Sequence, residues 1–409
     1  MILRNWSGNV AYSTEVLHRP AGVDQLQQLV ADAPRIRALG TGHTFNTITD
    51  TDGALVTLAG LDPIVHIDPA ARTVSAAAGM RFGELSSQLD AAGWALPNLG
   101  SLPHISLAGA CATGTHGAGN ANRCLAAAAV GIDFVQADGT LVSLDASDPA
   151  FPGSVLALGA LGIATSLTLA IEPAFQVRQD VWLDTPFATV LDRIDEIMAA
   201  GYSVSLFTDF TRPDIIDKIW IKTRTGAALA DGREWGAQPA TAAQHPIAGQ
   251  DPSAATEQLG VPGPWHARLP HFRLEFTPSA GEEQQSEYLL PRPHAAAALA
   301  ALRGLDLRAA LQVCELRTVA ADDLWLSPCG GRDTFALHFT WVDDDALVDA
   351  AVRAVEAALA PFDPRPHWGK VFTVDPRPHY PKLTEFRSLV DRHDPNHKFG
   401  NAFLERHVY

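Results

Sequence analysis

His43 has the sequence context of a residue that does chemistry. It lies in a turn with Gly40 and Gly42, directly after the apolar run 36–39, which we expect to form a short buried strand. The glycines allow the backbone of this turn to approach a ligand closely. An imidazole at such a place can act as a general base, a metal ligand or a covalent attachment point. A histidine that is only hydrogen-bonded within its loop is the alternative.

Two runs with strand character each carry a polar pair with one residue between its members. Glu315 and Arg317 lie in one run, and His338 and Thr340 lie in the other. Because alternate side chains of a strand point to one face, each pair shares a face. Buried charges must be paired or hydrogen-bonded. The two pairs therefore predict a polar-lined pocket, and a purely structural Glu–Arg ion pair across a sheet is the alternative.

Two glycine-dense loops, 40–46 and 100–119, are candidates for binding an anionic cofactor. Backbone N–H groups in loops of this kind can approach a pyrophosphate closely. No G-x-G-x-x-G stands between a strand and a helix, so a Rossmann-type dinucleotide site is not supported. Tight turns without a ligand are the alternative. The hydroxyl groups that can add donors belong to Thr41, Thr44, Ser106, Thr113 and Thr115.

These residues must be positioned by two units of mixed secondary structure. In residues 1–175 strands alternate with helices, and Glu172-Pro173 breaks the pattern. Asp138-Gly139 is a strong hairpin signal. The expected helices cover 23–31, 82–93 and 150–158, and the expected strands cover 36–39, 54–58, 64–67, 73–77, 130–135, 140–144 and 162–171.

The pattern of strands and helices in residues 176–366 predicts a second α+β unit. The Ala-, Gly-, Gln- and Pro-rich stretch 226–264 is expected to be a long irregular excursion over the surface or a mobile cap. The expected strands cover 203–210, 219–223, 272–276, 312–319 and 334–342, and the expected helices cover 188–199, 295–303 and 346–359.

Bulk properties exclude several classes of protein. The chain has 409 residues, enough for two separate cores, and a formal net charge of −16, which argues against nucleic acid or an anionic membrane as a partner. The start of the chain lacks a signal-peptide pattern, and no apolar run is long enough to cross a bilayer. We therefore expect a cytoplasmic protein. The four cysteines have no metal-site spacing, so we expect buried free thiols and no metal.

The ordered series of motifs resembles the aldonolactone/alditol oxidase branch of the vanillyl-alcohol-oxidase-type flavoproteins. The resemblance runs from Asn5 to Phe403. Its motifs are Gly-Thr-Gly-His over 40–43, the segments 94–101, 102–109 and 110–119, Glu-Leu-Arg over 315–317, His-Phe-Thr over 338–340 and His-Trp-Gly-Lys over 367–370. It implies a two-domain PCMH-type FAD-binding fold with a separate α+β cap domain, and a C-terminal segment 367–409 that returns to the FAD-binding domain.

For the cofactor, the resemblance implies FAD attached covalently through His43. A sibling group uses a second, cysteinyl link, but Leu102 stands at that place here, so a single histidyl link is expected. A side chain at position 100 can shield the reduced flavin from O2 in this family, and Gly100 has none, which favours an oxidase. The expected cofactor-binding residues are Gly40, Thr41, Gly42, His43, Thr44, Leu102, Ser106, Gly109, Thr113, Gly114, Thr115, His116 and Ile163.

For the substrate, the resemblance implies a small neutral polyol. The expected reaction is hydride transfer from a terminal carbinol carbon of an alditol, such as xylitol or sorbitol, to flavin N5, with O2 as acceptor and the aldose and hydrogen peroxide as products. The cluster of Arg317, Lys370 and His338 assists proton removal from the carbinol hydroxyl, and which of the three accepts the proton stays open. The expected catalytic residues are Lys370, Arg317, Glu315 and His338, and the expected substrate-binding residues are Ser101, Gln285 and Thr340.

Three alternatives stay open at this point. A sugar-1,4-lactone oxidase or dehydrogenase uses the same scaffold, although the segments 100–119 and 276–282 favour an alditol. The second alternative is a catalytically silent protein that uses this fold for binding. The third concerns one residue only, because Lys370 could be a solvated surface lysine. Gln284, next to Gln285, leaves the register of that pocket residue open. We expect a monomer.

Overall fold

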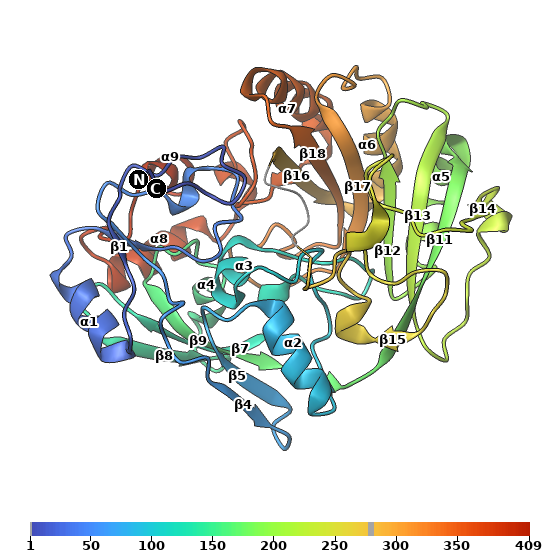
Figure 1. Cartoon of the computed structure of the whole chain (residues 1–409). Coiled ribbons are helices and arrows are strands. Elements are labelled where there is room, and N and C mark those ends of the chain that lie inside the picture. The colour runs from blue at the N-terminus through green and yellow to red at the C-terminus, as the bar shows by residue number, and fades with distance from the viewer. Residues whose placement is uncertain (1, 277–281) are drawn as a thin grey trace.

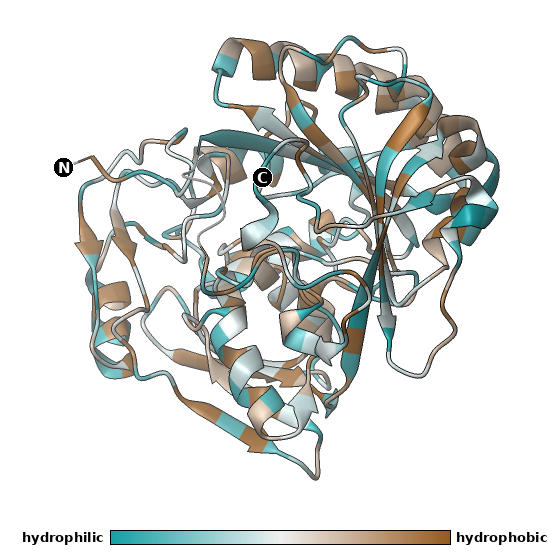
Figure 2. Ribbon diagram, turned by 45° about the vertical axis from the view of Figure 1, so that its right-hand side comes forward, coloured by the Kyte–Doolittle hydropathy of each residue, from teal (hydrophilic) through white to brown (hydrophobic). Residues whose placement is uncertain are grey.

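The computed structural model describes residues 2–276 and 282–409 and arranges them in two units, each built around its own sheets (Figure 1). Residues 277–281, which belong to the segment 276–282 that favoured an alditol, lie outside the described residues. Strands in both units alternate in hydropathy, and this is visible as brown and teal bands along the ribbons in Figure 2. Among the described residues no helix is both long and apolar enough to span a bilayer.

The first unit contains a parallel three-stranded sheet, an antiparallel five-stranded sheet and a short two-stranded ribbon. The strand orders are β1-β3-β2, β4-β5-β9-β7-β8 and β10-β6. The strands are β1 Leu17–His18, β2 Ile36–Ala38, β3 Ala54–Val56, β4 Val65–Asp68, β5 Thr73–Ala77, β6 Trp94–Ala95, β7 Ala129–Val135, β8 Leu141–Asp145, β9 Ile163–Ala170 and β10 Glu172–Pro173. The helices are α1 Val23–Asp32, α2 Phe82–Ala91, α3 Leu107–Thr113 and α4 Phe151–Ser154.

Most elements predicted for this unit are confirmed, including the hairpin at Asp138-Gly139, where Gly139 has a φ of 87°. The helix predicted over 150–158 is wrong beyond its first turn. Leu158 has a φ of 56°, a left-handed conformation that cannot continue a helix. The Arg37 guanidinium also donates to the Leu158 carbonyl at 2.9 Å and so holds the chain in this path.

The second unit is one nine-stranded sheet with helices α5, α6 and α7 on one face (Figure 1). The strand order is β14-β11-β13-β12-β17-β18-β16-β19, and β15 pairs with β11. The strands are β11 Gln176–Pro186, β12 Ser203–Thr208, β13 Ile215–Arg224, β14 Gln238–Pro239, β15 Gly263–Pro264, β16 Glu283–Pro291, β17 Leu311–Val319, β18 Thr334–Val342 and β19 Arg365–Pro366. The helices are α5 Phe187–Met198, α6 Ala295–Leu302 and α7 Asp345–Leu359.

Two features of this sheet differ from expectation. The strand predicted over 272–276 is wrong, because Phe272 forms only an isolated bridge with Ala255 and residues 274–276 then turn, while the Phe272 N–H donates to the Ser101 carbonyl of the first unit. Strands β11 and β16 were not predicted. Every β16 residue from Glu283 to Leu290 is buried although the five residues from Glu283 to Glu287 are polar, so the strand lacks the apolar alternation that marks a one-sided strand.

The C-terminal segment packs on the first unit. Helices α8 Leu383–His393 and α9 Ala402–His407 belong to it, and they lie beside the first unit in Figure 1. The Ile36 N–H of β2 donates to the Lys398 carbonyl at 3.1 Å, and the Asn401 side chain donates to the Ile48 carbonyl at 3.0 Å. This return carries residues 367–370 past the boundary between the two units. The boundaries at 175/176 and 366/367 remain our prediction.

Candidate active site

A cavity of about 610 Å³ lies where the two units meet, and it is lined by loops of the first unit and by strands of the second. All of the predicted site residues line it except Gly114 and Ile163. Gly114 has a φ of 78° and ends helix α3. The Ile163 side chain packs into an apolar core beside Phe399, while its neighbours Gly162 and Ala164 line the cavity. The structure thus brings together the two glycine loops and both polar strand pairs.

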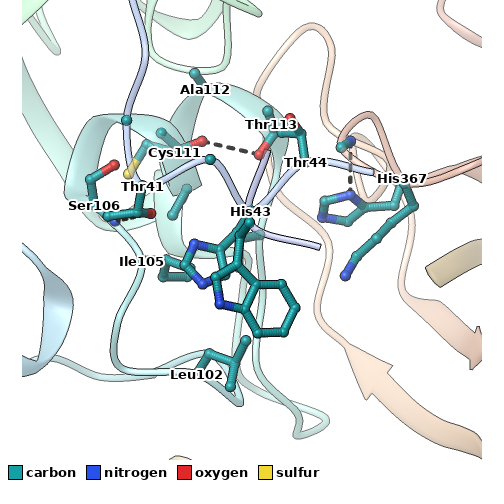
Figure 3. Close-up of a pocket in the computed structure, with 18 of the residues that line it drawn as sticks. Thr41, His43, Thr44, Leu102, Ile105, Ser106, Cys111, Ala112, Thr113 and His367 are labelled. Atoms are coloured by element: carbon teal, nitrogen blue, oxygen red, sulfur yellow. Dashed lines mark hydrogen bonds between the residues drawn. The ribbon is translucent and has the colours of Figure 1, made fainter. Parts of the chain in front are cut away.

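The turn that carries His43 is held by Trp6, which also lines the cavity. The Trp6 N–H donates to the Gly42 carbonyl at 2.8 Å, and the Trp6 ring stacks on the His43 imidazole with centroids 5.0 Å apart. Gly42 has a φ of 71°, which favours glycine. The imidazole lies in the cavity beside Ile105 and above Leu102 (Figure 3). Its orientation is therefore fixed before any ligand binds.

His43 has the chemical state of a nucleophile. Burial lowers the pKa of its imidazole to about 4, and the charge of Lys370 acts in the same direction, so the ring is neutral at pH 7. Its Nδ1 atom is buried without a hydrogen-bond partner among the described residues. A neutral, buried nitrogen in a cavity wall is available to a ligand.

The two glycine loops pack tightly against each other. A side chain at Gly40 would place its Cβ 2.6 Å from Ser106 Oγ, and one at Gly109 would place it 2.7 Å from the same atom. The Ser106 N–H donates to Thr41 Oγ1 at 3.3 Å and ties the loops together. Because the glycines lack side chains, backbone groups form this part of the cavity wall. Together with the unpartnered nitrogen of His43, this cradle fits a flavin dinucleotide.

The hydroxyl groups of this wall are not equivalent. Thr41 accepts from the Ser106 N–H and keeps its own proton for a ligand. Thr113 donates to the Gly109 carbonyl at 3.0 Å within helix α3, so its proton is already used (Figure 3). Thr44 lies 3.4 Å from the Thr49 hydroxyl. Of these three hydroxyls, that of Thr113 is the one whose proton is committed to a protein carbonyl.

Across the cavity, strands β16, β17 and β18 present a cluster of charged side chains. Gln285 lies opposite Thr340 in the β16–β18 pairing, and His338 lies opposite both Glu287 and Glu315. The pairing places these side chains on one face of the sheet. It also settles the register left open by the sequence, because Gln285 lines the cavity while Gln284 binds Asp345 at 2.6 Å on the other face.

Arg317 lies at the centre of this cluster between two carboxylates. Its Nη2 donates to Glu287 Oε1 at 2.5 Å, its Nε lies 3.6 Å from Glu315 Oε1, and its Nη1 donates to Ser101 Oγ at 3.3 Å. Burial alone would raise the pKa values of the two carboxyls, but the Arg317 charge outweighs it and holds both well below their usual range. Both are therefore ionised, and Ser101 is linked to the cluster across the boundary between the units.

Glu287 was not predicted from the sequence. Besides Arg317 it has His116 Nε2 at 3.1 Å and His338 Nδ1 at 3.4 Å, and 2 % of its surface is exposed. The spacing rule that identified the other strand pairs also applies to Glu287, because Gln285 and Glu287 are separated by one residue and so share a face of the strand. It escaped notice because the strand itself was not predicted.

Lys370 is positioned by both units. The Asn46 side chain donates to its carbonyl at 2.7 Å, and the Val371 N–H donates to the Gln285 carbonyl at 2.8 Å. The Lys370 ammonium donates to the Gln285 side chain and lies 4.8 Å from the centre of the Phe45 ring. Burial lowers its pKa to about 8, and Arg317 acts in the same direction. A solvated surface role for Lys370 is therefore excluded.

Comparison with known proteins places the chain among flavoproteins. Residues 14–145 match the model of an FAD binding domain, and residues 282–407 match that of D-arabinono-1,4-lactone oxidase. The chain is 50 % identical to an alditol oxidase from a Streptomyces species over 98 % of its own length and 97 % of the relative's. It is 28 % identical to an L-gulono-1,4-lactone dehydrogenase of Mycobacterium tuberculosis, over 99 % and 98 % of the two chains.

Solved structures confirm the predicted fold class. The structure of the cholesterol oxidase of B. sterolicum aligns with this chain at a TM-score of 0.79 and 14 % sequence identity. The alignment covers 100 % of this chain and 96 % of the cholesterol oxidase. A solvent-stable cholesterol oxidase matches with a TM-score of 0.81 at 13 % identity. At this identity the likeness concerns the fold alone, which is the two-domain vanillyl-alcohol-oxidase/PCMH type.

Proposed function

Because this chain belongs to the alditol oxidase family of FAD-dependent oxidoreductases, we propose that it oxidises a terminal carbinol group of a small neutral alditol such as xylitol or sorbitol. The observation that carries the proposal is the cluster of Arg317, Glu315 and Lys370, which faces the His43 loop across one cavity. A site that offers many fixed donors and acceptors suits a substrate with many hydroxyl groups, and discriminates against analogues that leave those groups unpaired.

The protein residues have separate roles in this proposal. When bound, FAD accepts the hydride from the carbinol carbon and passes two electrons to O2, which yields the aldose and hydrogen peroxide. Arg317 and Ser101 donate to the reacting hydroxyl, and Glu315 accepts from its neighbour. Lys370 takes the hydroxyl proton, because its lowered pKa leaves a usable fraction of neutral amine near pH 8. Thr340 and Gln285 bind the remaining hydroxyls.

An anaerobic spectrum of the purified protein tests the proposal. Adding xylitol is expected to bleach the flavin bands, and air is expected to restore them with one equivalent of peroxide. A spectrum that xylitol and sorbitol leave unchanged, but that a sugar 1,4-lactone bleaches, would replace the proposal by the lactone alternative. Bleaching without recovery in air would remove O2 as the acceptor. Tight packing does not impose the glycine at position 100, because the nearest atom to an added Cβ would be Thr115 Cγ2 at 3.4 Å.

We further propose that His43 carries FAD covalently, and that no second link exists because Leu102 cannot form one. In the variant His43→Ala, acid precipitation is expected to leave the flavin in the supernatant, whereas it stays in the pellet of the wild type. His104→Ala is the matched control, since His104 lies near His43 but binds the Leu274 carbonyl at 2.8 Å through Nε2. Yellow colour in the His43→Ala pellet would place the link elsewhere.

A cytoplasmic location and a monomeric state complete the proposal. All four cysteines, Cys111, Cys124, Cys314 and Cys329, are buried free thiols, as predicted, and this state suits a reducing compartment. Light scattering of the purified protein measures the oligomeric state directly.

A further inference from the structure

A buried hydrogen-bonded chain leads into the site along the cavity-facing side of the sheet. Lys222 of β13 places its Nζ 3.1 Å from His271 Nδ1, and His271 Nε2 lies 2.7 Å from Glu315 Oε1. The exposed fractions of Lys222, His271 and Glu315 are 1 %, 5 % and 5 %. Glu315 and His271 line the cavity, while Lys222 does not. Neither Lys222 nor His271 has a role in the reaction described above.

The chain has only one hydrogen-bond direction. The ionised Glu315 carboxylate can only accept, so His271 Nε2 must donate to it and His271 Nδ1 accepts from Lys222, whose own pKa burial lowers to about 7. The single proton of the neutral ring then lies on Nε2 and points at the Glu315 carboxylate. Burial lowers the pKa of His271 to about 4, which keeps the ring neutral at pH 7. Lys222 also donates to the carbonyls of Leu269 and Pro270, at 2.5 and 3.1 Å, so each of its three protons has an acceptor.

The His271 ring and backbone are both fixed. The rings of Phe207 and Trp220 lie edge-on to the imidazole, with centroids 5.7 and 5.2 Å away. The His271 N–H donates to the Ser101 carbonyl at 3.0 Å, and its carbonyl accepts from the Thr256 N–H at 2.9 Å. His271 therefore holds both the Glu315 side chain of β17 and the backbone of Ser101, which lies in a loop of the other unit.

We propose that His271 is a positioning residue that fixes Glu315 and Ser101 relative to each other for binding the polyol, and that Lys222 holds the His271 ring through the hydrogen bond to Nδ1. This inference rests on the proposed function. A Glu315 carboxylate without the His271 donor can rotate toward Arg317, only 3.6 Å away, and would then no longer face a substrate hydroxyl. Loss of His271 should therefore weaken polyol binding more than it slows the chemical step.

The tautomer can be measured without turnover. Histidine-selective ¹⁵N spectra of the wild-type holoenzyme are expected to show His271 with a protonated Nε2 and an unprotonated Nδ1; His271→Gln identifies the signal. In Lys222→Met, which removes the ammonium but keeps much of the volume, the Nδ1 signal is expected to shift. An unchanged spectrum in Lys222→Met would show that Lys222 does not bind His271 Nδ1 and would overturn that part of the proposal.

Kinetics test the coupling to Glu315. His271→Phe is expected to raise KM for xylitol roughly tenfold, the loss typical of a hydrogen bond to a charged group, with kcat changed less than about threefold. His271→Gln keeps a donor at the Nε2 position and is expected to restore most of the affinity. In a Glu315→Gln background, His271→Phe is expected to change KM by less than about twofold, because residues that act as one unit are not additive.

A matched control separates this role from general damage to the fold. Lys218→Met removes another buried ammonium from the same face of β13, one that donates to the Pro246 carbonyl at 3.0 Å. Its effect on KM is expected to combine independently with that of Glu315→Gln. Independent effects of His271→Phe and Glu315→Gln would overturn the proposal. A wild type that does not turn over alditols would instead refute the proposed function, and the ¹⁵N spectra would still report the tautomer.

Discussion

Replacing Lys370 with methionine is expected to lower kcat/KM for xylitol by about 10³-fold, within the range that a positioned general base contributes. The physical reason is that no other neutral amine lines the cavity near Arg317 among the described residues. FAD should stay bound, because the Lys370 side chain contacts Gln285 and the Phe45 ring, and its backbone, which Asn46 holds, is unchanged. Steady-state kinetics and the flavin absorbance of the variant measure both results.

The pH dependence identifies the base. Lys370 accepts a proton only when neutral, and its pKa lies near 8, so kcat/KM should rise with pH and level off above about pH 8. The rising limb should be absent in Lys370→Met. His338 is the competing base, and burial lowers the pKa of its imidazole below the ordinary value. If His338 were the base, kcat/KM would already be level at pH 7.

Lys370→Arg is the matched control for charge. Arginine keeps the cation beside Phe45 but does not lose its proton in this pH range. It should therefore be nearly as slow as Lys370→Met while binding xylitol more tightly. Activity in Lys370→Arg within tenfold of the wild type would show that Lys370 contributes a charge and not a base.

Local rules were sufficient to predict much of this site from the sequence. Strand periodicity placed Glu315 with Arg317 and His338 with Thr340, and these pairs do face one cavity. The glycine pattern around His43 predicted a close-approach turn, and Gly42 has the expected positive φ. Such features depend on residues within a few positions of each other, so they can be read without knowing the fold.

Features that depend on distant partners could not be predicted. The segment at His271 and Phe272 has the composition of a strand, but its N–H groups donate to Ser101, which lies in the other unit. Strand β16 is buried on both faces, so its polar residues hide it from a search for alternation. The pairing of Glu287 with Arg317 also joins two strands that do not neighbour each other in the sheet, because β18 lies between them. The order of the strands in the sheet cannot be read from the sequence alone.

Replacing Glu287 with glutamine is expected to lower the free energy of unfolding by about 3 kcal/mol, the usual cost of removing one partner from a buried ion pair. The amide leaves the Arg317 guanidinium with Glu315 at 3.6 Å as its nearest carboxylate. It also removes the charge 3.1 Å from His116 Nε2. Denaturant unfolding of both proteins at pH 7 measures the difference. Glu356→Gln is the matched control, because Glu356 is buried outside the cavity and accepts from neutral groups such as the Tyr288 hydroxyl at 2.9 Å.

The sign of the pH dependence follows from the Glu287 pKa. Although burial would raise it, the Arg317 charge and the neighbouring His116 and His338 hold it well below the usual value in the folded protein. A depressed pKa contributes stability that is complete above the unfolded value, about 4.3, and that is lost as the pH falls toward the folded value. The stability difference between wild type and Glu287→Gln should therefore be constant from pH 7 to about 5 and shrink below about 4. If the stability difference is still undiminished at pH 3, the glutamine destabilises the protein because of its shape and not because the charge is missing. The ionised Glu287 would then not be the group that holds Arg317 in the site.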